Sequence, residues 1–202
     1  MKNTNAKQAR IALPEPESMT PEQLAVYNAV ISGPRGVLVG PLRAALLKPE
    51  LASRWQKLGE TLRYNTSLPK RISELAIIAT ARRWNSDLEW IIHAKAALAG
   101  GLSADIVNAL EKGLRPTFVE PEEGNVYDFA RELLQTGSVN DTLYEQVRGR
   151  WSDEGVMELT AIIGYYSMVA MTLNAHQIPL PENAEPVFLL QDGEPRQLTE
   201  LS

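Results

Sequence analysis

The spacing of apolar residues is helical almost throughout this chain, and this pattern constrains the fold more than any other feature. Apolar side chains recur three and four residues apart, as they do on one face of a helix, between breaks such as the one at 33–36. Only 187–190, between Pro186 and Gly193, has the composition of a strand. We therefore predict an all-α fold of about eight helices. They run from Thr20 to the first break, over 41–47 as a short turn, and over 50–65, 69–83, 87–99, 103–112, 125–136, 140–150 and 153–176.

Polar residues with capping spacing mark where several of these helices begin. Thr20, Pro21 and Gln23 have the pattern of a capping box with proline in the first helical position. Ser86 and Glu89 are also three residues apart, which predicts a second capping box at the start of 87–99.

The polar ends of the chain define its expected organisation. Residues 1–19 are polar and proline-bearing, which predicts an arm, and 182–202 predicts an extended tail. Between them, 20–181 has the length of a single domain. The stretch 159–173 carries no charge but is too short for a bilayer, so we interpret 153–176 as a central core helix and expect no contact with a membrane.

The composition excludes several kinds of site. The chain of 202 residues has no cysteine, so it cannot make a disulfide, a thiolate nucleophile or a cysteine-ligated metal centre by itself. Two histidines, His93 and His176, are too few for a multi-histidine metal site, so we expect no metal. The net charge of −5 gives no reason to bind nucleic acid. No apolar run follows Met1, so we expect no signal peptide and a cytoplasmic location.

Glu89 and His93 are the candidate catalytic residues. They lie four apart in the helix expected over 87–99, so their side chains share a face and can meet. A carboxylate beside an imidazole orients the ring and makes it a competent general acid or base. The alternative is structural: Glu89 then binds a backbone N–H in the capping box with Ser86, and His93 is an ordinary half-buried residue.

Several segments together resemble one protein family. They are Glu74 to Ile77, Ala81 to Trp84, Glu89 to His93 and Ala99 to Ser103, with the later run 158–166. This combination resembles the carboxymuconolactone decarboxylase family of the alkylhydroperoxidase D-like superfamily. The resemblance implies a helical bundle that assembles as a homo-oligomer, with dimer, trimer and hexamer all open, and a small-molecule substrate. Glu89 and His93 match the Glu-x-x-x-His positions of the family.

The resemblance also implies a reaction class. One branch of the family reduces peroxides with a Cys-x-x-Cys pair, and a chain without cysteine cannot be such a peroxidase unless a partner supplies the thiol. The decarboxylase-like branch implies a cofactor-free lyase that acts on a small carboxylated lactone or ring by general acid–base catalysis. The alternative is a non-enzymatic oligomeric protein of the same fold that binds a small ligand or serves as a scaffold.

Four further residues are candidates for substrate binding, each with a structural alternative. Arg82 and Arg83 can position a carboxylate, or they can stabilise the C-terminal end of their helix. Trp90 can wall a pocket or pack in the core. The hydroxyl of Tyr165 needs a partner, which a polar cavity or an interface would supply. For His176, at the end of its helix, a cap-like role is favoured over catalysis.

Overall fold

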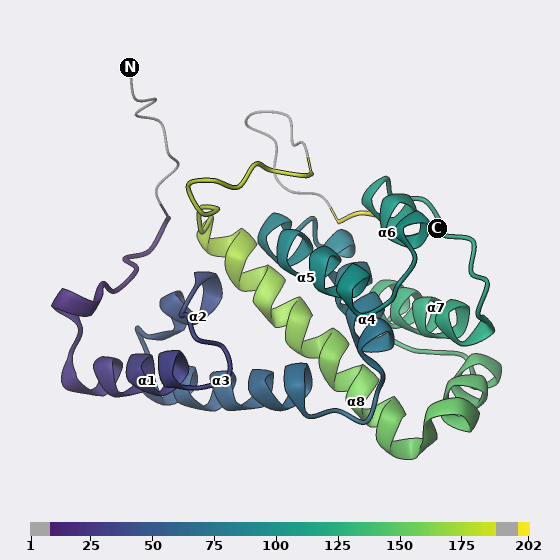
Figure 1. Cartoon of the computed structure of the whole chain (residues 1–202), viewed down its shortest axis with the longest axis horizontal. Helices are drawn as coiled ribbons and strands as arrows, with labels where there is room; N and C mark the ends of the chain where they lie inside the picture. The colour runs from purple at the N-terminus through teal and green to yellow at the C-terminus, as the bar shows by residue number, and fades with distance from the viewer. Residues whose placement is uncertain (1–8, 189–197) are drawn as a thin grey trace. The chain divides into compact units, whose positions relative to one another are not determined.

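The computed structural model describes residues 9–188 and 198–202, and its described part holds eight α-helices, one short 3-10 helix and no strand (Figure 1). The all-α prediction is confirmed. Residues 187–188 form no strand, and the rest of the candidate strand lies outside the described residues. The chain divides into two compact units, residues 1–65 with 172–184 and residues 66–171 with 185–202. The predicted single domain over 20–181 therefore includes parts of both units.

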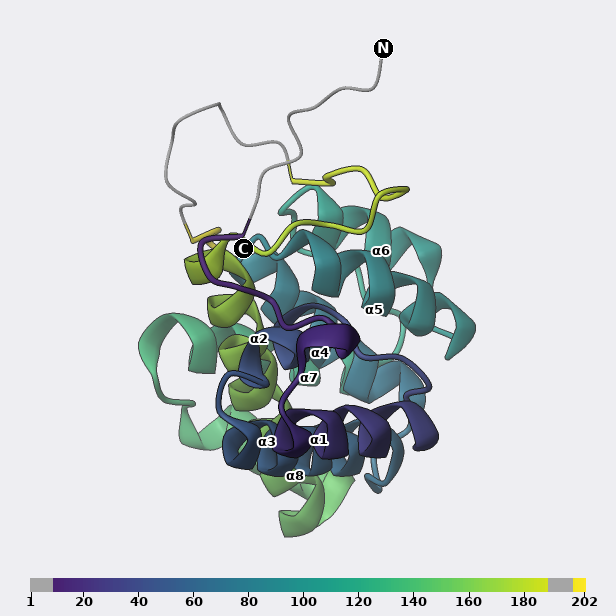
Figure 2. The same cartoon turned by 90° about the vertical axis from the view of Figure 1, so that its left-hand side faces the viewer.

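The first unit consists of short helices packed around α3 (Figure 2). The Thr20 side chain accepts the N–H of Gln23 at 3.3 Å and the Gln23 side chain accepts the N–H of Thr20 at 2.9 Å, so the first capping box is confirmed. The end of α8 is held by the arm, since the N–H of Arg10 donates to the carbonyl of His176 at 2.8 Å. The helices are η1 (Pro16–Ser18), α1 (Pro21–Ser32), α2 (Gly40–Ala45) and α3 (Pro49–Tyr64), with the last turn of α8.

The second unit is organised around α4, which packs against α5 and α7 (Figure 1). Residues 72–81 of α4 are all buried, whereas buried and exposed residues are interspersed along 153–176 of the more apolar α8. Helix α4 is therefore the central helix of the second unit. The helix expected over 125–136 begins earlier, because Pro121 occupies its first position and acidic residues fill its first turn. The helices are α4 (Lys70–Arg83), α5 (Asp87–Ala99), α6 (Ala104–Glu111), α7 (Pro121–Thr136) and α8 (Asp141–His176) up to residue 171.

Helix α8 is interrupted near its start. Ser152 has φ 64° and ψ 176°, which are not helical values, so the expected separation of 140–150 from 153–176 falls at this residue. Glu158 then anchors α8 within the second unit, because its carboxylate accepts the N–H and the hydroxyl of Ser67 at 3.0 and 2.7 Å. By length and composition α8 is able to cross a membrane, but half of its most apolar stretch is buried in the structure.

The turn between α4 and α5 is a Schellman motif that uses asparagine. Asn85 adopts φ 48°, the N–H of Asn85 donates to the carbonyl of Arg82, and the N–H of Ser86 donates to the carbonyl of Ala81. Ser86 thus completes the end of one helix while it precedes the next. The predicted capping box is wrong, because the Ser86 side chain makes no cap hydrogen bond to the start of α5.

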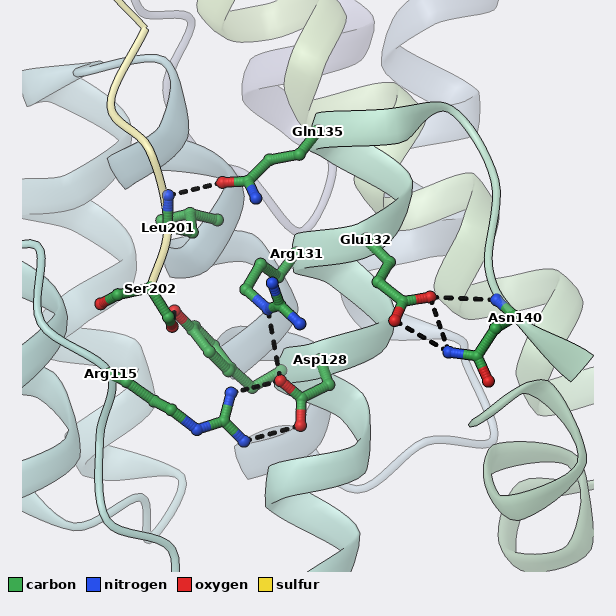
Figure 3. Close-up of polar contacts among 9 residues, drawn as sticks. Arg115, Asp128, Arg131, Glu132, Gln135, Asn140, Leu201 and Ser202 are labelled. Atoms are coloured by element: carbon green, nitrogen blue, oxygen red, sulfur yellow. Dashed lines mark hydrogen bonds and ion pairs between the residues drawn. The ribbon is translucent and has the colours of Figure 1, made fainter. Parts of the chain in front are cut away.

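The described part of the C-terminal tail packs on the second unit of its own chain. The N–H of Thr199 donates to the carbonyl of Arg83 at 2.9 Å, and the N–H of Leu201 donates to the Gln135 side chain at 2.6 Å (Figure 3). The Tyr127 hydroxyl donates to the Ser202 carbonyl at 2.8 Å. These contacts hold the described end of the predicted extended tail on its own chain, and the homo-oligomer stays a prediction.

Helix α7, on which the tail ends, is stabilised by side-chain contacts (Figure 3). Asp128 accepts from Arg115 at 2.7 Å and from Arg131 at 3.4 Å. The Glu132 carboxylate accepts the backbone N–H of Asn140 at 3.0 Å, which connects the end of α7 to the start of α8. This part of the tail therefore binds a helix whose side chains form ion pairs and hydrogen bonds.

Asp87 holds the other described part of the tail, because its buried carboxylate oxygen accepts the N–H groups of Val187 and Phe188 at 2.9 and 2.8 Å. Replacing Asp87 with Ala leaves these two donors unpaired, and we expect a loss of about 1–3 kcal/mol in the free energy of unfolding. Urea denaturation measures this loss. The exposed first-turn acid Asp105, replaced by Ala, is the control and should cost less than about 1 kcal/mol. Equal losses in both variants would contradict the prediction.

Candidate active site

A line of four ionisable side chains joins α4 to α5 and contains His93. The Nδ1 atom of His93 lies 2.7 Å from Oε2 of Glu74. The other oxygen of Glu74 lies 2.7 Å from the Nζ atom of Lys70, and Nε2 of His93 lies 3.5 Å from Oε2 of Glu89. One imidazole ring is therefore held between two carboxylates, and a lysine sits behind the first of them.

Local sequence explains how these groups meet. Lys70 and Glu74 are four apart on α4, and Glu89 and His93 are four apart on α5, so each pair lies on one face of its helix. The tight α4–α5 turn folds the two helices against each other and brings Glu74 to His93. On α8, the ring of Tyr166 lies edge-on to the imidazole, with centroids 4.8 Å apart and planes at 80°.

The cluster is enclosed except at its lysine. The side chains of Glu74 and His93 are 0% and 2% exposed, that of Glu89 is 8% exposed, and that of Lys70 is 44% exposed. Burial by itself would raise the pKa of Glu74, but the hydrogen bond and charge of His93, together with those of Lys70, lower the pKa below its ordinary value of 4.5. Glu74 is therefore a carboxylate at neutral pH.

An ionised Glu74 determines the role of each imidazole nitrogen. A carboxylate accepts hydrogen bonds, so Nδ1 of His93 carries a hydrogen and donates a hydrogen bond to Glu74. The remaining nitrogen, Nε2, faces Glu89 and is the one that can exchange a proton. The arrangement is suited to moving a single proton at Nε2 while Glu74 keeps the ring oriented.

Sequence reasoning found part of this cluster. Glu89 and His93 come together as their spacing indicated, although their catalytic role stays a prediction. Glu74, the residue closest to the imidazole, was missed as a site residue. The sequence did contain a signal for Glu74, because it is the single acid immediately before the apolar run 75–79. A carboxylate buried beside such a run needs a cationic or hydrogen-bonding partner.

The arginines lie against the tail. Arg82 donates to the carbonyl of Leu110 at 3.1 Å, near the end of α6, and to the Thr199 hydroxyl at 2.8 Å, and it also binds Asn85. Arg83 donates to the Thr199 carbonyl at 2.8 Å. Within the described residues, both guanidinium groups bind the tail and that of Arg82 also binds the end of α6, whereas the cluster of His93 lies elsewhere.

The two aromatic candidates have different neighbours. Trp90 is buried and packs edge-on against Phe188 of the tail, with ring centroids 5.3 Å apart. Tyr165 is buried and packs edge-on against Tyr166 at 5.2 Å, and Tyr166 in turn contacts His93. Tyr165 is thus one ring away from the cluster. Among the described residues, no group of three histidine or acidic side chains is placed to hold a metal ion.

Solved structures share this helical arrangement. An AhpD-core, peroxidase-related protein from Ralstonia eutropha aligns with a TM-score of 0.70 and 15% identity, over 86% of this chain and 93% of that one. A peroxidase-related protein from a Silicibacter species aligns with a TM-score of 0.70 and 14% identity, over 90% of this chain and 97% of that one. A variant of the debrominase Bmp8, in complex with 2,3,4-tribromopyrrole, aligns with a TM-score of 0.69 and 13% identity, over 88% of this chain and 95% of that one.

The class defined by these alignments is the AhpD-like fold, here without cysteine. Residues 49–132, which include Glu74, Glu89 and His93, match the model of the carboxymuconolactone decarboxylase family. This match confirms, over that segment, the resemblance seen in the sequence. No curated protein sequence matches the chain.

Proposed function

We propose that this protein is an enzyme, a cofactor-free lyase that removes carbon dioxide from a small carboxylated lactone or ring by general acid–base catalysis. The observation that carries the proposal is the imidazole of His93, held at Nδ1 by the Glu74 carboxylate with Nε2 directed at Glu89. Such a ring can hold and release one proton at a defined atom.

The proposed step breaks the bond between a ring carbon and the carboxylate. The electron pair of that bond passes through the conjugated double bond onto the lactone carbonyl, and carbon dioxide leaves. The resulting dienolate is protonated on carbon from Nε2 of His93, and the substrate itself provides the electron sink. Glu74 stabilises the imidazolium before this transfer. Afterwards Glu89 takes up a proton from water and passes it to Nε2, which restores the imidazolium.

The substrate class rests on the comparisons. The family that matches residues 49–132 is named for a carboxylated lactone, and the debrominase with the same fold is in complex with a small substituted ring. Both favour a small cyclic molecule here. We do not assign substrate binding to Arg82 and Arg83, because their guanidinium groups donate hydrogen bonds to Thr199 of the tail.

A second function is favoured by the burial of the cluster. Glu74 and His93 are almost completely enclosed, as is typical of a structural ion pair, so a small-ligand-binding protein of the same fold is the alternative. The two functions differ in one result. A binding protein retains its ligand unchanged, and an enzyme releases carbon dioxide.

The test supplies carboxymuconolactone to the purified protein in deuterated water. We expect carbon dioxide to be released and one deuterium to appear on carbon in the product. Glu89→Gln, which cannot return the proton, is expected to lower kcat by about 10- to 100-fold. The exposed Glu154→Gln is the matched control and should leave kcat unchanged. Binding without carbon dioxide release would favour the alternative, and neither binding nor release would reject both functions.

A further inference from the structure

Ser86 immediately precedes α5, the helix that carries the proposed acid–base pair. It lies three residues before Glu89, a spacing at which the residue before a helix and the residue in its first turn are neighbours, and seven before His93. All three residues are buried, and Ser86 is 1% exposed. A molecule that contacts Glu89 at the start of α5 would lie near Ser86.

The hydroxyl of Ser86 is buried and has no hydrogen-bond partner within the part of the chain that the structure describes. The other two hydroxyl residues that precede helices differ from it, since Thr20 and Ser103 both accept a backbone N–H of their own helix. Their ψ angles are 162° and 138°, whereas that of Ser86 is 96°.

The Schellman turn is the cause of this difference. Because the N–H of Ser86 is bonded to the Ala81 carbonyl, its backbone is held away from the usual capping conformation. Polar groups in protein interiors are nearly always paired, so a buried hydroxyl that its own helix does not use indicates a ligand.

We infer that Ser86 is a catalytic residue of the proposed lyase, whose hydroxyl donates a hydrogen bond to the lactone carbonyl oxygen. This inference rests on the proposed function. Negative charge develops on that oxygen as carbon dioxide leaves, so a donor aimed there stabilises the transition state more than the substrate. Glu89 is an acceptor when ionised, and the proton on Nε2 of His93 goes to carbon in the proposed step, so Ser86 supplies the hydroxyl donor for the carbonyl oxygen.

The first test compares two serine variants. Ser86→Ala is expected to lower kcat by about 10- to 1000-fold while KM changes by less than about threefold, as for a donor that acts mainly in the transition state. Its melting temperature should stay the same or rise, because an unpaired buried hydroxyl is removed. Ser86→Thr keeps the hydroxyl and should restore part of kcat. Ser103→Ala is the control, with a lower melting temperature and unchanged kcat.

A second measurement does not depend on turnover. A saturated γ-lactone carboxylate lacks the conjugated electron sink and serves as an unreactive probe. The infrared band of its lactone carbonyl should lie at lower frequency when bound to the unmodified protein than when bound to Ser86→Ala. The same band in both proteins, or no binding of the probe, would overturn the inference.

The results separate the inference from the proposed function. Turnover that Ser86→Ala leaves unchanged overturns the role of Ser86 and keeps the lyase. A carbonyl shift that depends on Ser86, without turnover of carboxymuconolactone, keeps Ser86 as a binding group and rejects the lyase.

Discussion

His93→Asn is expected to lower kcat for carboxymuconolactone by about 100- to 10,000-fold, the range that general acid–base groups contribute. Asparagine can still donate an N–H to Glu74 from a position close to that of Nδ1, so the buried carboxylate keeps a partner. It has no atom that gains and loses a proton near neutral pH. The loss should therefore appear in kcat, with a fold that circular dichroism finds intact.

His176→Asn is the matched control for this prediction. His176 is the other histidine of the chain and ends α8, where its backbone carbonyl accepts the N–H of Arg10. Its replacement should change kcat by less than about twofold, because the substitution keeps that backbone contact. If both variants retained the kcat of the unmodified protein, His93 would not be the proton donor.

Glu74→Ala should destabilise the protein by about 3–5 kcal/mol, the usual cost of removing one partner from a buried ion pair. The substitution deprives His93 of its closest partner and leaves Lys70 beside a neutral site. Chemical denaturation at neutral pH measures the change. A loss below about 1 kcal/mol would contradict the assignment of Glu74 as the anchor of the cluster.

The effect of Glu74 on stability should depend on pH in a defined direction. Its pKa in the folded protein is below the ordinary value of 4.5, because the interactions with His93 and Lys70 outweigh burial. An ionised Glu74 therefore stabilises the folded state fully above about pH 4.5, and this contribution is lost as the pH falls through the lowered pKa.

The isosteric variant Glu74→Gln isolates the contribution of this charge. Its free energy of unfolding should be lower than that of the unmodified protein at pH 6 and should approach it at acidic pH, where the unmodified carboxylate is also neutral. Glu74→Ala should remain less stable at every pH, because its cavity persists. A constant difference for Glu74→Gln down to acidic pH would show that the charge does not stabilise the fold.

The secondary structure was largely predictable from the sequence. Helical spacing, the capping box at Thr20 and the break at 33–36 act over a few residues, and the local patterns placed α3, α4 and α5 within one or two residues. The start of α7 was placed too late, because Pro121 and the acids after it read as a loop until their role as a first helical turn is recognised.

The pairing of Glu89 with His93 was also predictable, because residues four apart on a helix meet whatever surrounds them. The partner of Nδ1 was not. Glu74 and His93 are nineteen residues apart and belong to different helices, so only the packing of α4 on α5 decides that they touch.

The same distinction explains one correction and one set of contacts that the sequence did not predict. The sequence around Ser86 is typical of a helix cap. In the structure the N–H of Ser86 is hydrogen-bonded to the carbonyl of Ala81, and its hydroxyl makes no cap hydrogen bond to α5. The tail reads as an extended polar segment, and only the structure shows that Asp87 and Arg83 bind its backbone on the surface of the second unit. Local patterns thus determined which segments are helical and which side chains share a face. Which faces meet depends on contacts between distant segments, and these form only when the chain has folded.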